Sequence, residues 1–142
     1  MRMTINLIAA CALCMSGATS FAQSKPSYAQ ARAFYDEMDK TVMQTGVWHQ
    51  RTPEQRMQAK RASVALSKRA DTLFGVDGPG KQCAMAATWH NDYVGNLNRI
   101  VGIMQGDSTT AQQLLAMQRT AADLGQTRAW CREYIETLDS KK

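Results

Sequence analysis

Residues 114–138 read LLAMQRTAADLGQTRAWCREYIETL, and their apolar residues recur alternately three and four positions apart. This spacing is the a and d pattern of a heptad, which lines one face of a helix that packs on other helices. The positions of the repeat are Leu114, Met117, Ala121, Leu124, Arg128, Cys131, Ile135 and Leu138, with Arg128 as the polar exception. The stretch predicts a long helix whose heptad face lies in the core of a helical bundle.

A second stretch with a seven-residue repeat precedes it, from about Gln82 to Met104. Gly106 and Asp107 interrupt the pattern between the two stretches, and Asp107 or Ser108 can cap the helix that follows. We therefore expect two antiparallel helices joined by a turn near Asp107. The repeat of the earlier helix consists of Cys83, Ala86, His90, Tyr93, Leu97, Ile100 and Met104.

Two cysteines agree with this helical hairpin. Residues at one level of an antiparallel pair that turns at Asp107 have numbers that add up to about 214, and Cys83 and Cys131 add up to 214. Both cysteines also belong to the apolar repeats of their helices. We expect a disulfide between Cys83 and Cys131.

Two more amphipathic segments come before the hairpin. Ser27 can begin the first with a capping box and Gly46 ends it; its apolar positions are Tyr28, Ala31, Phe34, Tyr35, Met38 and Val42. Thr52 and Pro53 begin the second, and the glycine-rich residues 75–80 end it; its apolar positions are Ala59, Ala62, Leu66, Ala70 and Leu73. Four such segments predict an all-α fold, an up-down-up-down four-helix bundle with the disulfide between its third and fourth helices.

The first 22 residues are typical of a cleaved secretory signal peptide of bacterial size. Arg2 supplies a positive charge, an apolar run over residues 7–15 follows, and Ser20 and Ala22 have the small side chains that cleavage requires. Lipidation of Cys11 is an alternative, but it leaves a very short leader. We expect cleavage after Ala22, a periplasmic location and a single domain over residues 23–142, with no further segment that could span a membrane.

The composition of the whole chain excludes a disordered protein, because 44% of its residues are hydrophobic and only 20% are charged. Known catalytic motifs are missing as well. Residues 75–81, GVDGPGK, fit part of a phosphate-binding loop, but Gln82 stands where the motif needs a hydroxyl, and a helix precedes the loop instead of a strand. Haem-attachment, zinc-binding and nucleophile motifs do not occur. We expect no catalytic activity, no cofactor and no metal.

His90 and Arg128 are the polar residues on the otherwise apolar faces. They form either a polar layer that fixes the register of the helices or a small pocket for an anion. In a further interpretation, His90 ligates haem iron together with a methionine, Met38 or Met43. A buried Arg128 needs a carboxylate partner, and the acidic candidates are Asp36, Asp39 and Asp71.

Positive charge is concentrated between positions 51 and 71, a stretch that contains six basic residues and two acidic ones. The face of the second helix opposite to its apolar positions is either simply solvated or binds a partner. Trp and Arg, which are enriched in protein interfaces, occur beside it. The candidate contact residues in and after the preceding loop are Trp48, His49, Arg51, Arg56, Lys60 and Arg61, with Lys81 and Asp107 at other loop tips.

Export argues against nucleic acid as the partner and leaves an acidic protein, anionic lipid headgroups or cell-wall polymers. The sequence therefore predicts a small periplasmic binding protein, most simply an inhibitor or immunity protein that blocks a toxin or hydrolase. One alternative is a carrier that holds a small ligand or haem near His90. Another is an envelope-stress chaperone or sensor that exposes apolar surface on acid or metal challenge.

Overall fold

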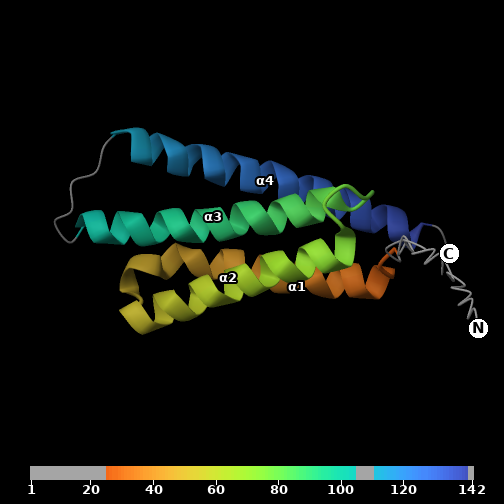
Figure 1. Cartoon of the computed structure of the whole chain (residues 1–142), viewed down its shortest axis with the longest axis horizontal. Coiled ribbons are helices and arrows are strands. Elements are labelled where there is room, and N and C mark those ends of the chain that lie inside the picture. Colours follow the sequence, from red (N-terminus) through yellow and green to blue (C-terminus); the bar gives the residue numbers. More distant parts are fainter. Residues whose placement is uncertain (1–24, 105–110, 141–142) are drawn as a thin grey trace, which may run out of the picture.

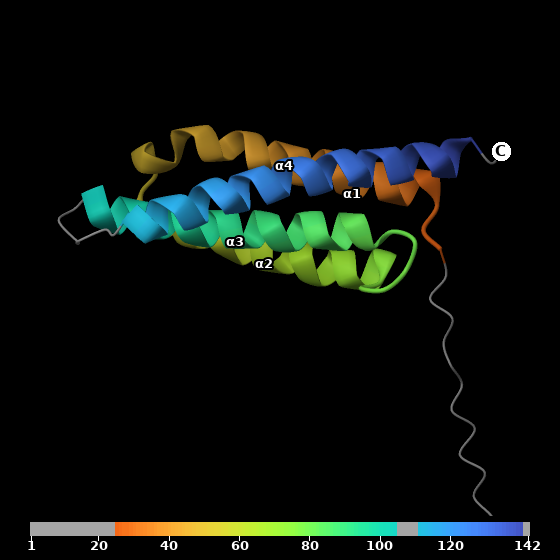
Figure 2. The same cartoon turned by 90° about the horizontal axis from the view of Figure 1, so that it is seen from above.

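The computed structural model describes residues 25–104 and 111–140, so the expected signal peptide and Asp107 lie outside the described residues. The described elements are α1 (Tyr28–Met43), the 3₁₀ helix η1 (Gln44–Gln50), α2 (Pro53–Phe74), α3 (Lys81–Met104) and α4 (Ala111–Asp139). Figures 1 and 2 show the four α-helices side by side, with α1 next to α4, α4 next to α3, and α3 next to α2. The predicted all-α four-helix bundle is confirmed.

Local signals in the sequence set the beginnings of α1 and α2. The Ser27 hydroxyl accepts the backbone N–H of Gln30 at 3.2 Å, and the side-chain oxygen of Gln30 accepts the N–H of Ser27 at 2.9 Å. Thr52 and Gln55 form the same reciprocal pair at the start of α2. Both predicted capping boxes are confirmed, and each satisfies two backbone donors that the first helical turn leaves open.

The loop between α2 and α3 depends on its glycines. Gly75 ends α2 with a φ of 71°, which strains any residue with a side chain. A Cβ on Gly80 would lie 2.8 Å from the ring of Phe74 and 2.9 Å from the ring of Tyr134. The segment with the partial phosphate-loop motif is therefore a tight helix–helix connection packed on aromatic side chains.

The predicted disulfide is confirmed between Cys83 on α3 and Cys131 on α4, with an S–S distance of 2.01 Å and a Cα–Cα distance of 4.6 Å. Both cysteines are fully buried. They lie in the larger of two hydrophobic clusters, at the end of the bundle near the 75–80 loop. In this cluster the rings of Phe34 and Phe74 meet edge to face at 5.1 Å.

The second cluster lies toward the η1 end and contains Trp48, Val94 and Val101. The expected heptad face of α4 is only partly confirmed in this half of the molecule, where Leu124 is buried as predicted. Leu114 is 48% exposed and Ala121 is exposed, while Thr120 and Thr127 are buried instead. The two threonine hydroxyls donate to carbonyls one turn earlier in their own helix, which removes the cost of burying them.

The lengths of the helices explain this difference. The helix α1 has 16 residues and its antiparallel neighbour α4 has 29, so α1 covers only the later half of α4. Leu114 has the spacing of a core residue, but α1 ends before it reaches that level. A similar correction applies to α2, where the expected core residue Ala62 is exposed and Ser63 is fully buried against Asn91.

No helix within the described ranges is long and apolar enough to cross a membrane.

Candidate functional site

A groove of about 560 Å³ lies at the η1 end of the bundle, between the last turns of α1, η1 and the first half of α2. We call it the η1–α2 groove. Its charged lining residue is Arg51, and no carboxylate is among the described residues that line it. Its polar lining residues are Thr41, Gln50, Gln55 and Gln58, and its apolar ones are Val47, Ala59 and Ala62.

The position of Arg51 is fixed by the end of η1. Its backbone N–H donates to the carbonyl of Trp48 at 3.2 Å, and its guanidinium lies 5.3 Å from the centre of the Trp48 ring. This cation–π contact holds the charge over a buried ring at the edge of the groove. Arg56, one turn into α2, donates through Nη1 to the carbonyl of Arg51 at 2.9 Å. Two guanidinium groups are thus held at one corner.

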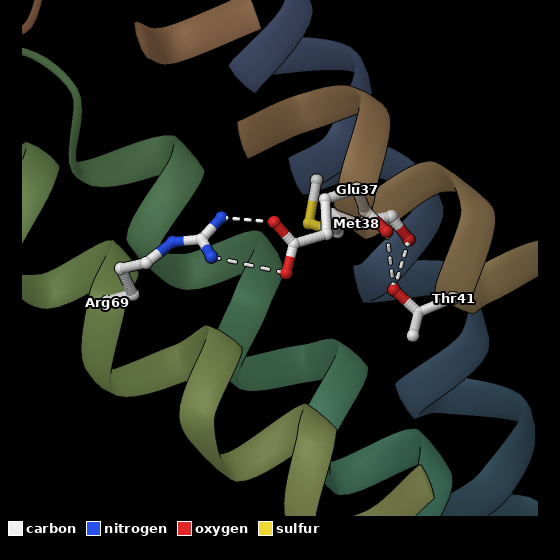
Figure 3. Close-up of polar contacts among 4 residues, drawn as sticks. All are labelled: Glu37, Met38, Thr41 and Arg69. Carbon is white, nitrogen blue, oxygen red and sulfur yellow. Dashed lines mark hydrogen bonds and ion pairs between the residues drawn. The ribbon is translucent and has the colours of Figure 1, made fainter. Parts of the chain in front are cut away.

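The uncharged lining comes from helical spacing. Gln55, Gln58 and Ala62 are three and four residues apart, so they follow one another along the same side of α2. On the opposite wall, the hydroxyl of Thr41 lies within hydrogen-bond distance of the Glu37 and Met38 carbonyls, at 2.7 and 3.0 Å (Figure 3). That hydroxyl is satisfied within its own helix, and the groove donors and acceptors are mainly the glutamine amides.

Trp48 does not have the position that the sequence suggested. It was expected in an exposed loop as a partner contact, but it belongs to η1 and is only 3% exposed. The physical reason is the short α1: the chain folds back after Met43, and the indole fills the space beside Val94 and Val101. Trp48 therefore supports Arg51 from beneath, and its side chain does not form a contact surface.

Lys60 also departs from the expected solvent-facing position. Its ammonium donates to the backbone carbonyl and to the side-chain oxygen of Asn91 on α3, each at 2.9 Å. Gly95 makes room for this contact, because a Cβ there would lie 3.3 Å from Lys60 Nζ. Lys60 is therefore part of the α2–α3 interface and is not a surface cation.

The remaining predicted contact residues differ in how they are held. His49 and Arg61 are exposed, while Arg51 and Arg56 are partly buried at the groove corner. Farther along α2, Arg69 forms a bidentate ion pair with Glu37 of α1 (Figure 3). The basic face is thus divided: its far end binds α1, its middle binds α3 through Lys60, and its beginning borders the groove.

Glu54 is the acidic residue in the first turn of α2. A hydrogen bond from its own backbone, the Thr52 side chain and the nearby Arg56 lower its pKa below the usual value, in that order of effect. Glu54 is therefore ionised near neutral pH, where it interacts favourably with the positive end of the α2 dipole. It is not among the residues that line the groove.

The polar residues of the predicted core, His90 and Arg128, have different neighbours. Arg128 forms an ion pair with Asp39, one of the three carboxylates that the sequence offered, and this pair connects α4 to α1. His90 is 1% exposed, and both of its ring nitrogens lack a hydrogen-bond partner among the described residues. Burial first, and then the charge of Lys60, lower the His90 pKa to about 4.

The positions of the two methionines do not favour the haem interpretation. Met43 is 75% exposed at the end of α1, and Met38 is fully buried in the larger hydrophobic cluster. Groups of three or more His, Cys, Asp or Glu that could hold a metal ion are not found in the described part of the chain.

The sequence interpretation missed the groove residues Val47, Gln50 and Gln58. The groove wall formed by α2 could have been predicted, because Gln55 and Gln58 lie on one side of α2, next to the preceding Arg51. The opposite wall could not be seen in the sequence, since it depends on how η1 folds back on α1.

Comparison of the chain with models of protein families, with curated proteins and with solved structures finds no match.

Proposed function

We propose that this protein is a periplasmic binding module without catalytic activity, and that an acidic segment of a partner protein docks in the η1–α2 groove. The observation that carries the proposal is the lining of the groove, where Arg51 is charged, the described residues include no carboxylate, and Arg56 lies directly beside it.

The chemistry of the lining suits an acidic peptide segment. A carboxylate that enters the groove meets the guanidinium of Arg51, which can form strong charge-assisted hydrogen bonds with it. The amides of Gln50 and Gln58 can donate to or accept from the peptide backbone on either side. Val47 and Ala62 supply apolar contact beside the charges, a mixture that is usual at protein interfaces.

The surroundings of the groove favour a protein over a small ligand. The exposed apolar side chains of Met43 and Met57 lie on the segments that form the groove. Methionine is enriched where one protein surface adapts to another. The cation–π contact with Trp48 holds Arg51 in place before binding, which lowers the entropy cost of association. An inhibitor or immunity protein that acts on an exported toxin or hydrolase is the form of this function that we favour.

Export to the periplasm is part of the proposal. A buried disulfide is favoured in an oxidising compartment, which agrees with the signal-peptide pattern of the sequence. Mass spectrometry of the protein isolated from the periplasm should give a chain that begins at Gln23. A chain that stays in the cytoplasm with its first 22 residues would contradict this part.

The groove can be tested with a fluorescein-labelled, twelve-residue peptide of Asp, Glu and Leu, with binding followed by fluorescence anisotropy. Gln58→Glu places a carboxylate in the groove and should weaken binding about tenfold at low salt, since like charges oppose association. The matched control is Gln126→Glu, the same change at an exposed position on α4, which should leave binding close to that of the unmodified protein.

The same pair of positions serves to identify the natural partner. A photocrosslinking amino acid at position 58 should capture an acidic protein in the periplasm, and one at position 126 should not. If Gln58→Glu and Gln126→Glu weaken peptide binding equally, the attraction comes from net charge alone and the groove is not the binding site.

A further inference from the structure

A second candidate surface lies at the other end of the bundle, around the loop between α2 and α3 (Figure 1). Met85 on α3 is 41% exposed and Trp130 on α4 is 42% exposed, although both side chains are large and apolar. Together with Lys81 and Glu133 they line a hollow of about 560 Å³ between the two helices. We call this the Met85–Trp130 surface.

The hollow continues past Met85 onto α2. Met85 and Lys81 also line a second hollow of about 260 Å³, whose other residues include Asp71, Val76 and Trp89. Two tryptophans and a methionine on adjoining hollows are the side chains that contribute most at protein interfaces. The Cys83–Cys131 disulfide joins α3 and α4 at residues adjacent in sequence to Gln82 and Trp130, so the two helices that form the surface are held together in advance.

The charges at this surface indicate which molecule fits it. Lys81 and Glu133 line the same hollow with opposite charges, yet neither takes part in an ion pair among the described residues. An apolar centre with one cation and one anion at its sides is complementary to itself after a two-fold rotation. The whole chain carries a net charge of +5, and +4 once Arg2 is removed with the expected signal peptide, so two copies carry a net repulsion. Within the hollow between α3 and α4, the charges of Lys81 and Glu133 cancel, so a second copy can approach there.

The side chain of Gln82 adds an unsatisfied group to the hollow. Its oxygen Oε1 is buried and has no hydrogen-bond partner among the described residues. A buried acceptor without a donor costs free energy, which a donor supplied by an incoming chain would recover.

We propose that the protein forms a symmetric homodimer through the Met85–Trp130 surface, in which Lys81 of each copy pairs with Glu133 of the other. Met85 and Trp130 of both copies become buried at the centre. Since this surface and the η1–α2 groove lie at opposite ends of the bundle, both grooves of such a dimer stay open. The proposal does not depend on the function proposed for the groove.

Analytical ultracentrifugation of the isolated protein, with its disulfide intact, measures the association directly. Because the apolar centre is small, we expect a dimer with a Kd of about 10 μM, within the range of transient interfaces. Lys81→Glu gives two like-charge contacts per dimer and should weaken association at least tenfold, and Glu133→Lys should do the same. Lys68→Glu, at an exposed position on α2, is the control for the change in net charge and should not weaken it.

Mixing the two variants gives the decisive measurement. When Lys81→Glu meets Glu133→Lys, every charged contact across the two-fold axis again joins opposite charges. Equal amounts of two monomeric variants should therefore form a heterodimer with nearly the original Kd, whereas each variant alone should not associate.

Two results would overturn the proposal. One is a monomeric mass for the unmodified protein at all concentrations up to about a hundred times the expected Kd. The other is a dimer that persists unchanged in both charge variants, which places the interface elsewhere. A monomer whose capture of another protein is lost in Lys81→Glu would assign the surface to a different partner and also reject the homodimer.

Discussion

Acid is expected to destabilise this bundle through one side chain, His90, well before most carboxylates are protonated. The imidazole is buried, has no hydrogen-bond partner among the described residues and lies near the positive charge of Lys60. These surroundings favour the neutral ring and lower its pKa from 6.5 to about 4.

The sign and size of the effect follow from this pKa. As the pH falls below about 6.5, His90 binds a proton in the unfolded chain, while in the folded protein it stays neutral down to about pH 4. Acid therefore favours the unfolded chain in this window. The contribution of neutral His90 is complete above pH 6.5 and is lost as the pH approaches 4. At 1.36 kcal/mol per pH unit, the loss amounts to about 3 kcal/mol.

The measurement is the free energy of unfolding in urea, followed by far-UV circular dichroism, at half-unit steps from pH 7.5 to 4 without reductant. Carboxylates also begin to titrate in this range, so the quantity of interest is the difference between the protein and a variant without the ring. His90→Leu keeps an apolar side chain of similar size. Its stability should fall less steeply with acid than that of the unmodified protein, by about 1 kcal/mol per pH unit.

His49→Gln is the matched control, because it removes the other histidine of the chain at an exposed position. The reasoning about His90 is refuted if His90→Leu and the unmodified protein lose stability in parallel between pH 6.5 and 4. A ring pKa near 6.5 for His90 in the folded protein, measured by NMR, would refute it equally.

Three further changes test individual contacts of the fold. Asp39→Asn removes the charge partner of Arg128, whose side chain is three-quarters buried, and should lower the free energy of unfolding in urea by about 1–3 kcal/mol. The double variant with Arg128→Met should regain most of this loss. If the losses of the two single variants simply add, the pairing is contradicted. Replacing Cys83 and Cys131 with alanine should lower stability by up to about 4 kcal/mol in the chain-entropy model, with an unchanged midpoint as the contrary result. Thr52→Ala removes the side-chain acceptor of the α2 capping box and should cost about 1 kcal/mol, whereas Thr52→Ser should keep most of that contribution.

At the candidate site, charge and helical spacing predicted the positions of some side chains but not of others. Charge and helical spacing led to the first part of α2, and Arg51 and Arg56 do lie at the groove corner. Lys60 has the same charge and nearly the same place in the pattern, but its side chain contacts α3. There Asn91 supplies two acceptors and Gly95 leaves room for the ammonium. Nothing within α2 distinguishes these cations; their neighbours on other helices do.

Three features of this protein follow from the sequence by itself: the number of α-helices, the capping boxes that begin α1 and α2, and the pairing of Cys83 with Cys131. Helical periodicity and capping depend on residues that are close in the chain, and the cysteine pairing depends only on the position of the turn between two helices. All three can therefore be predicted from the sequence. The burial of Trp48 and the exposure of Leu114 were decided only by the tertiary structure. Whether an apolar residue is covered depends on where another helix ends, and α1 is too short to reach both ends of α4.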